Sequence, residues 1–197
     1  MGGVVAAKVA KDFEEKISKS ILIDPVLQPE SLKFQIPFFN ISNKSFISLL
    51  SVFKKNRASE MISNAKKRRS IFSDKDEIFN HYRGRGAFKN WPEESLKAYI
   101  NGGVISKNSQ INLSCNPEWE AKTFAVSYAA RTNFIKKLKI PSYVPYASDG
   151  TTLSSEIIDV LSSNTNYIFE KIKGSHFFPM EEKDLICGKI SNFINAS

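Results

Sequence analysis

The chain has 197 residues, and its 42% hydrophobic content can supply the core of one ordinary domain with an inserted lobe. No run of about 18 apolar residues is present, so the sequence offers no membrane-spanning helix and no secretion signal of the usual pattern. The net charge of +8 permits a polyanionic partner. However, basic side chains concentrate only at residues 66–69, without interleaved aromatic residues, so we expect a solvated helix face and no nucleic-acid partner.

The two cysteines indicate a reducing compartment. Cys115 and Cys187 are far apart in the sequence and form no CxxC pair, which argues against a zinc site and a disulfide framework. We expect both to be small packing residues. The corresponding location is cytoplasmic, unless a signal precedes Met1.

The first 28 residues predict one helix and one buried strand. Apolar residues fill almost every side of the early turns of a helix over residues 3–17, so this helix is expected to begin buried. The run "SILIDPV" follows, closed by Asp24-Pro25, as in a strand covered on both faces of a parallel sheet. Helix, short turn and buried strand form half of an α/β repeat.

Residues 29–130 differ in pattern and predict an all-helical insertion with a return to the core. Irregular sequence is followed by expected helices at 43–56, 57–69, 74–82 and 92–101. The last is the best bounded, because Pro92 stands in its first turn and Gly102-Gly103 closes it. A short extended segment, "INLSCNP", then leads to another helix from residue 117.

Residues 131–197 return to the α/β pattern and end with a histidine loop. The strands "SYVPYAS" and "NYIFEKIKG" flank a short helix, and a last helix begins near residue 180. His176 lies between the last strand and the last helix. The carboxyl edge of a parallel sheet is where open α/β folds place ligands and catalytic groups, so His176 is a candidate site residue. The alternative is a histidine that only caps neighbouring backbone.

Four segments in order carry a family resemblance. "MGG" leads into a helix, as the residues after the serine of a G-x-S-x-G nucleophile elbow do, where small residues allow helix and strand to pack closely. "ILIDP" looks like the next strand, 141–149 like the strand after the insertion, and "GSHFFPMEE" like a catalytic-histidine loop. Together they resemble the α/β-hydrolase family over essentially the whole chain. The resemblance implies an α/β fold: the C-terminal half of an α/β-hydrolase sheet, with about three parallel core strands and an inserted helical cap.

The resemblance also implies a catalytic triad. His176 corresponds to the general base, and the acid is either Asp24, at the end of its strand, or Asp149, in an Asp-Gly turn. We favour Asp24, since an ionised carboxylate directly after a buried strand needs a partner such as a histidine N–H. The nucleophile would be the residue just before Met1, and the backbone N–H of Met1 would serve the oxyanion hole. The chain as given is therefore expected to be an inactive N-terminal truncation.

The cap segment supplies candidate substrate contacts. Tyr82, Trp91 and Tyr99 fall in its densest polar and aromatic stretch, and Trp119 follows in "CNPEWEAKTF". The resemblance implies that such residues shape a pocket for an acyl or leaving group. The alternative is ordinary helix packing.

The expected function is hydrolysis of an ester, amide or similar small substrate by a nucleophile–His–acid triad. No cofactor and no metal are implied, because this mechanism needs none. The oligomeric state stays open. One alternative is an epoxide hydrolase or dehalogenase with an aspartate nucleophile, where Tyr82 or Tyr99 would donate to the substrate oxygen. The other alternative is a non-catalytic binding protein.

Overall fold

The chain divides into two units in the structure, a computed structural model that describes residues 2–27, 57–127 and 135–196. The core unit comprises residues 1–30, 83–96 and 130–197, and the lobe unit comprises residues 31–82 and 97–129. Residues 83–96, which we expected within the cap insertion, thus group with the core unit. The helix expected at 43–56 lies outside the described residues.

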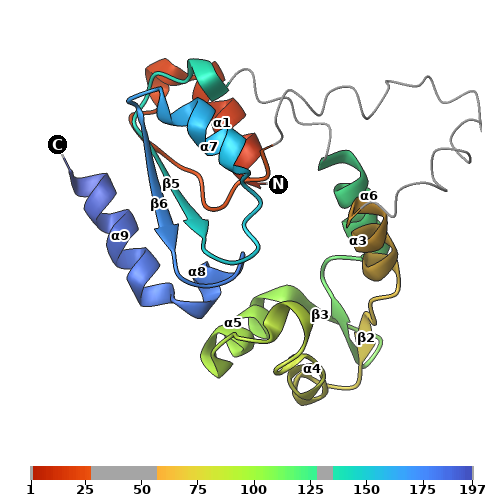
Figure 1. Cartoon of the computed structure of the whole chain (residues 1–197). Helices are drawn as coiled ribbons and strands as arrows, with labels where there is room; N and C mark the ends of the chain where they lie inside the picture. Colours follow the sequence, from red (N-terminus) through yellow and green to blue (C-terminus); the bar gives the residue numbers. More distant parts are fainter. Residues whose placement is uncertain (1, 28–56, 128–134, 197) are drawn as a thin grey trace, which may run out of the picture. The chain divides into compact units, whose positions relative to one another are not determined.

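A three-stranded parallel sheet organises the core unit, as the sequence predicts (Figure 1). Its order is β1 (Ser20–Ile21), β5 (Ser142–Ala147) and β6 (Tyr167–Ile172). Ser20 pairs with Ser142, and Tyr143 pairs with Ile168. The first strand is shorter than expected. Its pairing with β5 nevertheless continues, because the N–H of Leu22 donates to the Tyr143 carbonyl and that of Asp24 donates to the Pro145 carbonyl, each at 2.9 Å.

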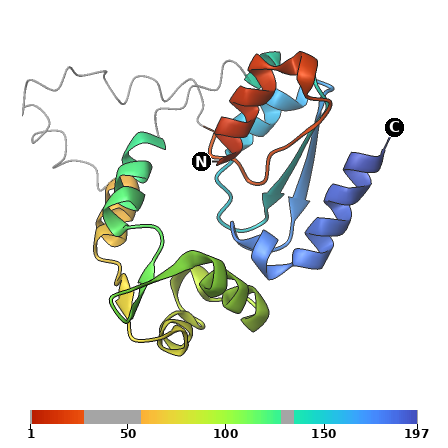
Figure 2. The same ribbon diagram turned by 180° about the vertical axis from the view of Figure 1, so that it is seen from behind.

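Helices cover both faces of this sheet (Figures 1 and 2). On one face lie α1 (Gly2–Asp12), followed by a 3-10 turn (Glu14–Lys16), and α7 (Ser155–Ser162). On the other face lie the short α8 (Phe178–Glu181) and α9 (Lys183–Asn195), where a single helix was expected. Two buried clusters result. The larger one joins Ala7 and Ala10 to Val144, Ile157 and Leu161, and the smaller one joins Ala147 and Ile172 to Phe178 and Ile186.

The expectation that α1 begins buried is wrong. Ala7 and Ala10 face the core, whereas Val5, Val9 and Phe13 are exposed by 58%, 44% and 46%. These three side chains recur every four residues and therefore form one apolar stripe, two of them in α1 and Phe13 directly after it. Apolar content alone predicted their burial, but in the described residues the buried cluster takes in Ala7 and Ala10 from the opposite face of α1.

The lobe unit is not all-helical, which corrects a second expectation. It contains α3 (Arg57–Lys66), α4 (Lys75–Tyr82), most of α5 (Glu93–Gly103) and α6 (Pro117–Ser127). It also contains an antiparallel sheet of β2 (Ile71–Phe72), β4 (Gln110–Leu113) and β3 (Val104–Lys107), in that order. The turn between β3 and β4 has left-handed φ values at Asn108 (51°) and Ser109 (57°), as two-residue hairpin turns require.

Two further 3-10 turns complete the elements of the described residues. One, Gly86–Phe88, lies in the core unit, and Ile135–Lys137 precedes β5. None of the helices in the described part of the chain combines the length and apolar character needed to cross a membrane.

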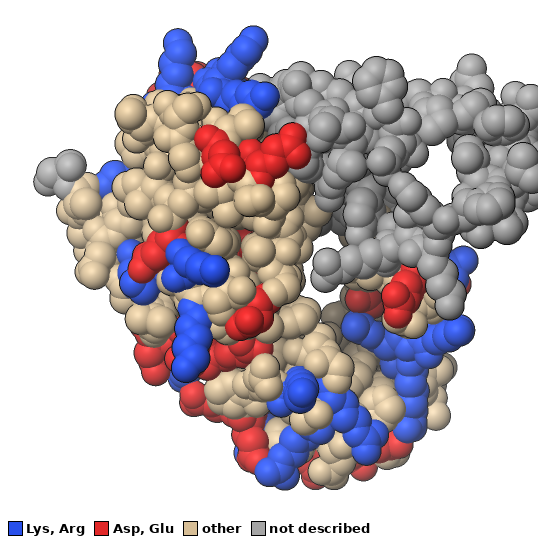
Figure 3. Space-filling view, viewed as in Figure 1, with Lys and Arg blue, Asp and Glu red and all other residues tan. Residues whose placement is uncertain are grey.

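The surface carries mixed charge, with basic and acidic side chains close together on the face shown in Figure 3. The basic run at residues 66–69 follows this pattern within the lobe unit. Arg68 pairs with Glu120 at 3.0 Å and Arg69 with Glu77 at 2.5 Å. Cys115 and Cys187 are both free and exposed, so the expectation that they are packing residues is wrong.

Candidate active site

Asp24 lies where β1 runs out at the carboxyl end of the sheet. Its residue is 2% exposed and its backbone has a left-handed φ of 37°, a conformation that costs energy in a residue with a Cβ atom. The β5 pairing at Pro145 and the helix packing behind it fix this position. A buried carboxylate in a strained backbone indicates a site whose geometry is imposed by the surrounding fold.

His176 lies in the loop after β6, and two features hold this loop. Gly174 has a φ of 127°, a backbone conformation in which any other residue is strained, and a Cβ atom there would also displace Oε2 of Glu181, which lies 2.9 Å away. The carboxylate of Glu181 then accepts from the N–H of Ser175 at 3.1 Å and from its hydroxyl at 2.6 Å. The residue before His176 is therefore anchored on both its backbone and its side chain.

The two side chains meet directly. Nδ1 of His176 lies 2.6 Å from Oδ2 of Asp24, although the residues are 152 positions apart in the sequence. The Asp24 side chain is fully buried, whereas that of His176 is 41% exposed. An ionised carboxylate can only accept, so Nδ1 carries the proton and Nε2 of the neutral ring is left with a lone pair. This arrangement equips Nε2 to take a proton from another group.

The alternative carboxylate, Asp149, is placed differently. It is exposed at the turn that Gly150 completes with a φ of 65°, and its Oδ2 accepts from the hydroxyl of Ser148 at 2.7 Å. Of the two candidate acids, Asp24 is therefore the one in contact with the imidazole.

Two threonines in the loop after β5, neither of them among the expected site residues, also contact Asp24. Oγ1 of Thr151 lies 2.5 Å from Oδ1 of Asp24. Oγ1 of Thr152 lies 2.8 Å from the Asp24 carbonyl oxygen and 3.1 Å from that of Pro25. The sequence did contain one signal, because the loop after β5 leaves the same edge of the sheet as the segments that carry Asp24 and His176. Threonine in a loop is, however, too common to mark a site.

The start of α1 lies against the end of β1, next to Asp24. A Cβ atom on Gly3 would lie 2.8 Å from Cβ of Pro25, whereas one on Gly2 would meet nothing within 4 Å. The close approach of helix and strand thus needs a small residue at Gly3 alone. Met1, the expected oxyanion-hole residue, lies outside the described residues.

Aromatic rings extend from His176 within the core unit. The Phe177 ring lies 5.5 Å from the imidazole, Trp91 lies 6.0 Å from Phe177, and Phe88 lies 5.0 Å from Trp91, measured between centroids. The segment that bears Trp91 is held against α8, where the hydroxyl of Ser95 donates to the Met180 carbonyl at 2.9 Å. Trp91 is therefore the expected substrate contact that the structure brings towards the histidine.

The other three expected substrate contacts belong to the lobe unit, and their role stays a prediction. Tyr82 is 7% exposed and packs on Phe72, and burial raises the pKa of its hydroxyl. Burial likewise raises the pKa of Tyr99. Trp119 is 68% exposed, with the Lys122 ammonium 5.2 Å from its ring centroid.

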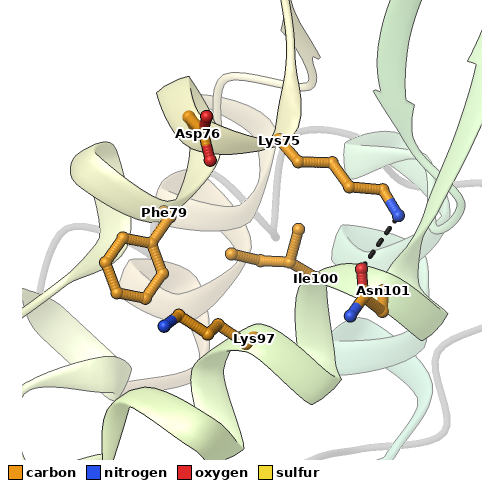
Figure 4. Close-up of a pocket in the computed structure, with 6 residues that line it drawn as sticks. All are labelled: Lys75, Asp76, Phe79, Lys97, Ile100 and Asn101. Atoms are coloured by element: carbon orange, nitrogen blue, oxygen red, sulfur yellow. Dashed lines mark hydrogen bonds between the residues drawn. The ribbon is translucent and has the colours of Figure 1, made fainter.

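A separate hollow of about 430 Å³ lies within the lobe unit between α4 and α5 (Figure 4). The side chains around it are mostly charged or polar, and one pair is bonded: Nζ of Lys75 donates to Oδ1 of Asn101 at 2.9 Å. Its lining residues are Lys75, Asp76, Phe79, Lys97, Ile100 and Asn101. None of them is an expected site residue. Within the described ranges, no group of three His, Cys, Asp or Glu side chains is placed to hold a metal ion.

Comparison with known proteins identifies the fold. No protein-family model matches the sequence, and no curated protein is a detectable relative. Solved structures do match. A peroxisomal alpha-beta-hydrolase from Saccharomyces cerevisiae is 15% identical with a TM-score of 0.70, over 98% of this chain and 49% of that one. E-2-(acetamidomethylene)succinate hydrolase is 13% identical with a TM-score of 0.70, over 99% of this chain and 62% of that one.

A third match is the enol-lactonase from Burkholderia xenovorans, 12% identical with a TM-score of 0.59, over 100% of this chain and 63% of that one. The chain therefore has the α/β-hydrolase fold, as the resemblance in the sequence implied. It spans between 49% and 63% of the length of these three structures.

Proposed function

We propose that this protein is an α/β-hydrolase that cleaves an ester, amide or similar small substrate, with His176 as the general base and Asp24 as the acid of its triad. The observation that carries the proposal is the 2.6 Å contact between Nδ1 of His176 and the buried Asp24 carboxylate, at the carboxyl ends of two parallel strands. The hydrolases and the lactonase of similar fold support the reaction class.

The pair performs two functions in this mechanism. Nε2 of His176 takes the proton of the attacking nucleophile and later returns it to the leaving group, or activates the water that releases the acyl intermediate. Asp24 holds the ring in the Nδ1–H tautomer and stabilises the imidazolium that forms. Its complete burial strengthens this interaction, because little water competes for the carboxylate.

The nucleophile is the component that a test must identify. Among the residues that the structure describes, Nε2 of His176 has no hydrogen-bond partner. The contact between Gly3 and Pro25 brings the beginning of α1 to the strand end that carries Asp24. A nucleophile on a turn leading into α1 would thus be delivered towards this corner, as the nucleophile elbow requires.

We assign Trp91 and Phe177 to the wall of the substrate site. Phe177 follows His176 directly and Trp91 packs on it, so both rings flank the reacting group on its apolar side. Such a wall suits an apolar acyl or alcohol portion of the substrate. Tyr82, Tyr99 and Trp119 remain proposed contacts of the lobe unit.

The decisive experiment supplies the nucleophile. The codons upstream of Met1 are read in frame, the extended and given chains are both expressed, and hydrolysis of a p-nitrophenyl ester is measured. We expect an in-frame G-x-S, activity in the extended chain and loss of that activity in His176→Gln.

Other outcomes would favour other functions. A G-x-D would favour the epoxide-hydrolase or dehalogenase alternative. A stop codon directly upstream, or activity that survives His176→Gln, would overturn the proposal, and a folded but inert extended chain would favour a binding protein.

A further inference from the structure

The hydroxyl of Thr151 has a defined donor direction. Its oxygen accepts the backbone N–H of Leu153 at 3.1 Å and lies 2.5 Å from Oδ1 of Asp24. An ionised carboxylate has no proton to give, so the single hydroxyl proton of Thr151 points to Asp24. The N–H of Leu153 thereby orients the Thr151 hydroxyl so that its proton faces the Asp24 carboxylate.

The two oxygens of Asp24 consequently have different partners. Oδ1 accepts from Thr151, and Oδ2 accepts from Nδ1 of His176. The terminal torsion of an aspartate is broad and nearly two-fold, so an unrestrained carboxylate would exchange its oxygens and vary its plane. A bond to one oxygen removes this freedom and aims the other at the imidazole.

Thr152, the residue after Thr151, fixes the backbone of Asp24. The hydroxyl of Thr152 is shared between the carbonyl oxygens of Asp24 and Pro25, at 2.8 Å and 3.1 Å. These carbonyls belong to the two peptide bonds that follow Asp24, whose φ is left-handed. The two threonines thus restrain different parts of the same residue, the side chain by Thr151 and the main chain by Thr152.

We infer that Thr151 is a positioning residue, whose hydroxyl fixes the Asp24 carboxylate so that Oδ2 holds His176 in its Nδ1–H tautomer. This inference rests on the proposed function, because it takes Asp24 as the triad acid. The loop after β5 also holds the alternative acid, Asp149. In this protein the loop instead supports Asp24, through the hydroxyl of Thr151, two residues after Asp149.

The test follows the Nδ1 proton of His176 by NMR of the ¹⁵N-labelled chain. The sequence has only two histidines, so His81→Gln and His176→Gln assign the signals. In Thr151→Val, which keeps the shape and removes the hydroxyl, we expect the Nδ1 proton to exchange with water at least about tenfold faster, since a buried hydrogen bond to a charged group is lost. Thr151→Ser keeps the hydroxyl and should restore slow exchange.

Ser154→Ala is the matched control. It removes the cap of α7 in the same loop, where the Ser154 side chain accepts from the N–H of Ile157 at 3.3 Å, without touching Asp24. We expect it to lower stability and leave the exchange rate of the Nδ1 proton unchanged. Unchanged exchange in Thr151→Val, or equally fast exchange in Ser154→Ala, would overturn the inference.

A second measurement applies even if Thr151→Val does not fold. In the unmodified chain, a hydroxyl proton held by a buried carboxylate exchanges slowly enough to be observed, so the Thr151 hydroxyl signal should be visible and should disappear in Asp24→Ala. An invisible hydroxyl signal in the unmodified chain would contradict the inference. Neither measurement needs a substrate or a nucleophile, so an inert extended chain would refute the proposed function, while these two proton signals decide the role of Thr151 on their own.

Discussion

The imidazole of His176 contacts Asp24 at 2.6 Å, while Asp149, in the loop where the triad acid was also expected, is exposed and bonded to Ser148. Asp24→Asn should therefore remove the partner that fixes the His176 tautomer. In a form of the protein that hydrolyses an ester, we expect kcat to fall by roughly 10³- to 10⁴-fold, as for a triad whose histidine takes the wrong tautomer.

Asp149→Asn is the matched control for this prediction, since it changes the other candidate acid in the same way. Its kcat should stay within about twofold of the parent, because a surface substitution away from the reacting groups has little effect. The reverse pattern, with Asp149→Asn inactive and Asp24→Asn active, would assign the acid to Asp149.

The adjacent glycines at the start of α1 should respond in opposite directions to alanine. At Gly3 a Cβ atom would lie 2.8 Å from Pro25, so Gly3→Ala forces helix and strand apart and should destabilise the fold by about 1–3 kcal/mol. At Gly2 the space is open, so Gly2→Ala should be neutral or stabilise by up to about 1 kcal/mol through helix propensity. Urea unfolding of both variants measures the difference. Equal effects would show that the helix does not approach Pro25 closely.

Local patterns in the sequence predicted most of the core unit. "SYVPYA" and "NYIFEKI" each carry apolar and β-branched or aromatic residues between turn signals, and they form β5 and β6. The hairpin of β3 and β4 was only half anticipated. Its turn is Asn108-Ser109, which lacks the glycine that usually marks a two-residue hairpin turn.

The remaining errors concern packing between distant segments. Val5 and Val9 were expected to be buried because they are apolar, yet both are exposed. Burial depends on which other segment packs against that face of the helix, and the residues near Val5 and Val9 in the sequence do not show this. The choice between Asp24, which the sequence favoured, and Asp149 stayed open for the same reason. Both carboxylates follow strands of one sheet, and only the three-dimensional path of the β6–α8 loop shows which one meets His176. Thr151 went unnoticed because its role arises entirely from that contact.

A second carboxylate gives a pH-dependent prediction. Glu170 accepts hydrogen bonds from Lys189 and, at 2.5 Å, from the Tyr143 hydroxyl. The bond from Lys189 is the main cause that lowers the pKa of Glu170 below its ordinary value of 4.5, with Tyr143 second. A carboxyl whose pKa is lower in the folded state contributes stability above its unfolded pKa, and this contribution is lost as pH falls through the folded pKa.

Glu170→Gln should therefore lower the free energy of unfolding at pH 7, and its difference from the parent should shrink steadily below about pH 4.5. Because the Glu170 side chain is 38% exposed, the effect should be modest. Urea unfolding at pH 7 and at lower pH measures it. Glu15→Gln, at an exposed position, is the control and should show no such trend. A gap between Glu170→Gln and the parent that widens on acidification would contradict the assignment.

The apolar stripe on α1 predicts limited solubility that surface charge should relieve. Val5, Val9 and Phe13 lie on one exposed face, and β1 forms an edge of the described parallel sheet, which leaves two surfaces open to self-association. Val9→Lys adds a charge at a side chain that is 44% exposed. It should raise the concentration at which the protein saturates in solution while changing the free energy of unfolding by no more than about 0.5 kcal/mol.

The control is Ala10→Lys, one residue further on at a position that is 2% exposed. It should instead unfold the chain, because it buries an unpaired ammonium. If Val9→Lys were equally damaging, Val9 would have to be covered by another part of the protein.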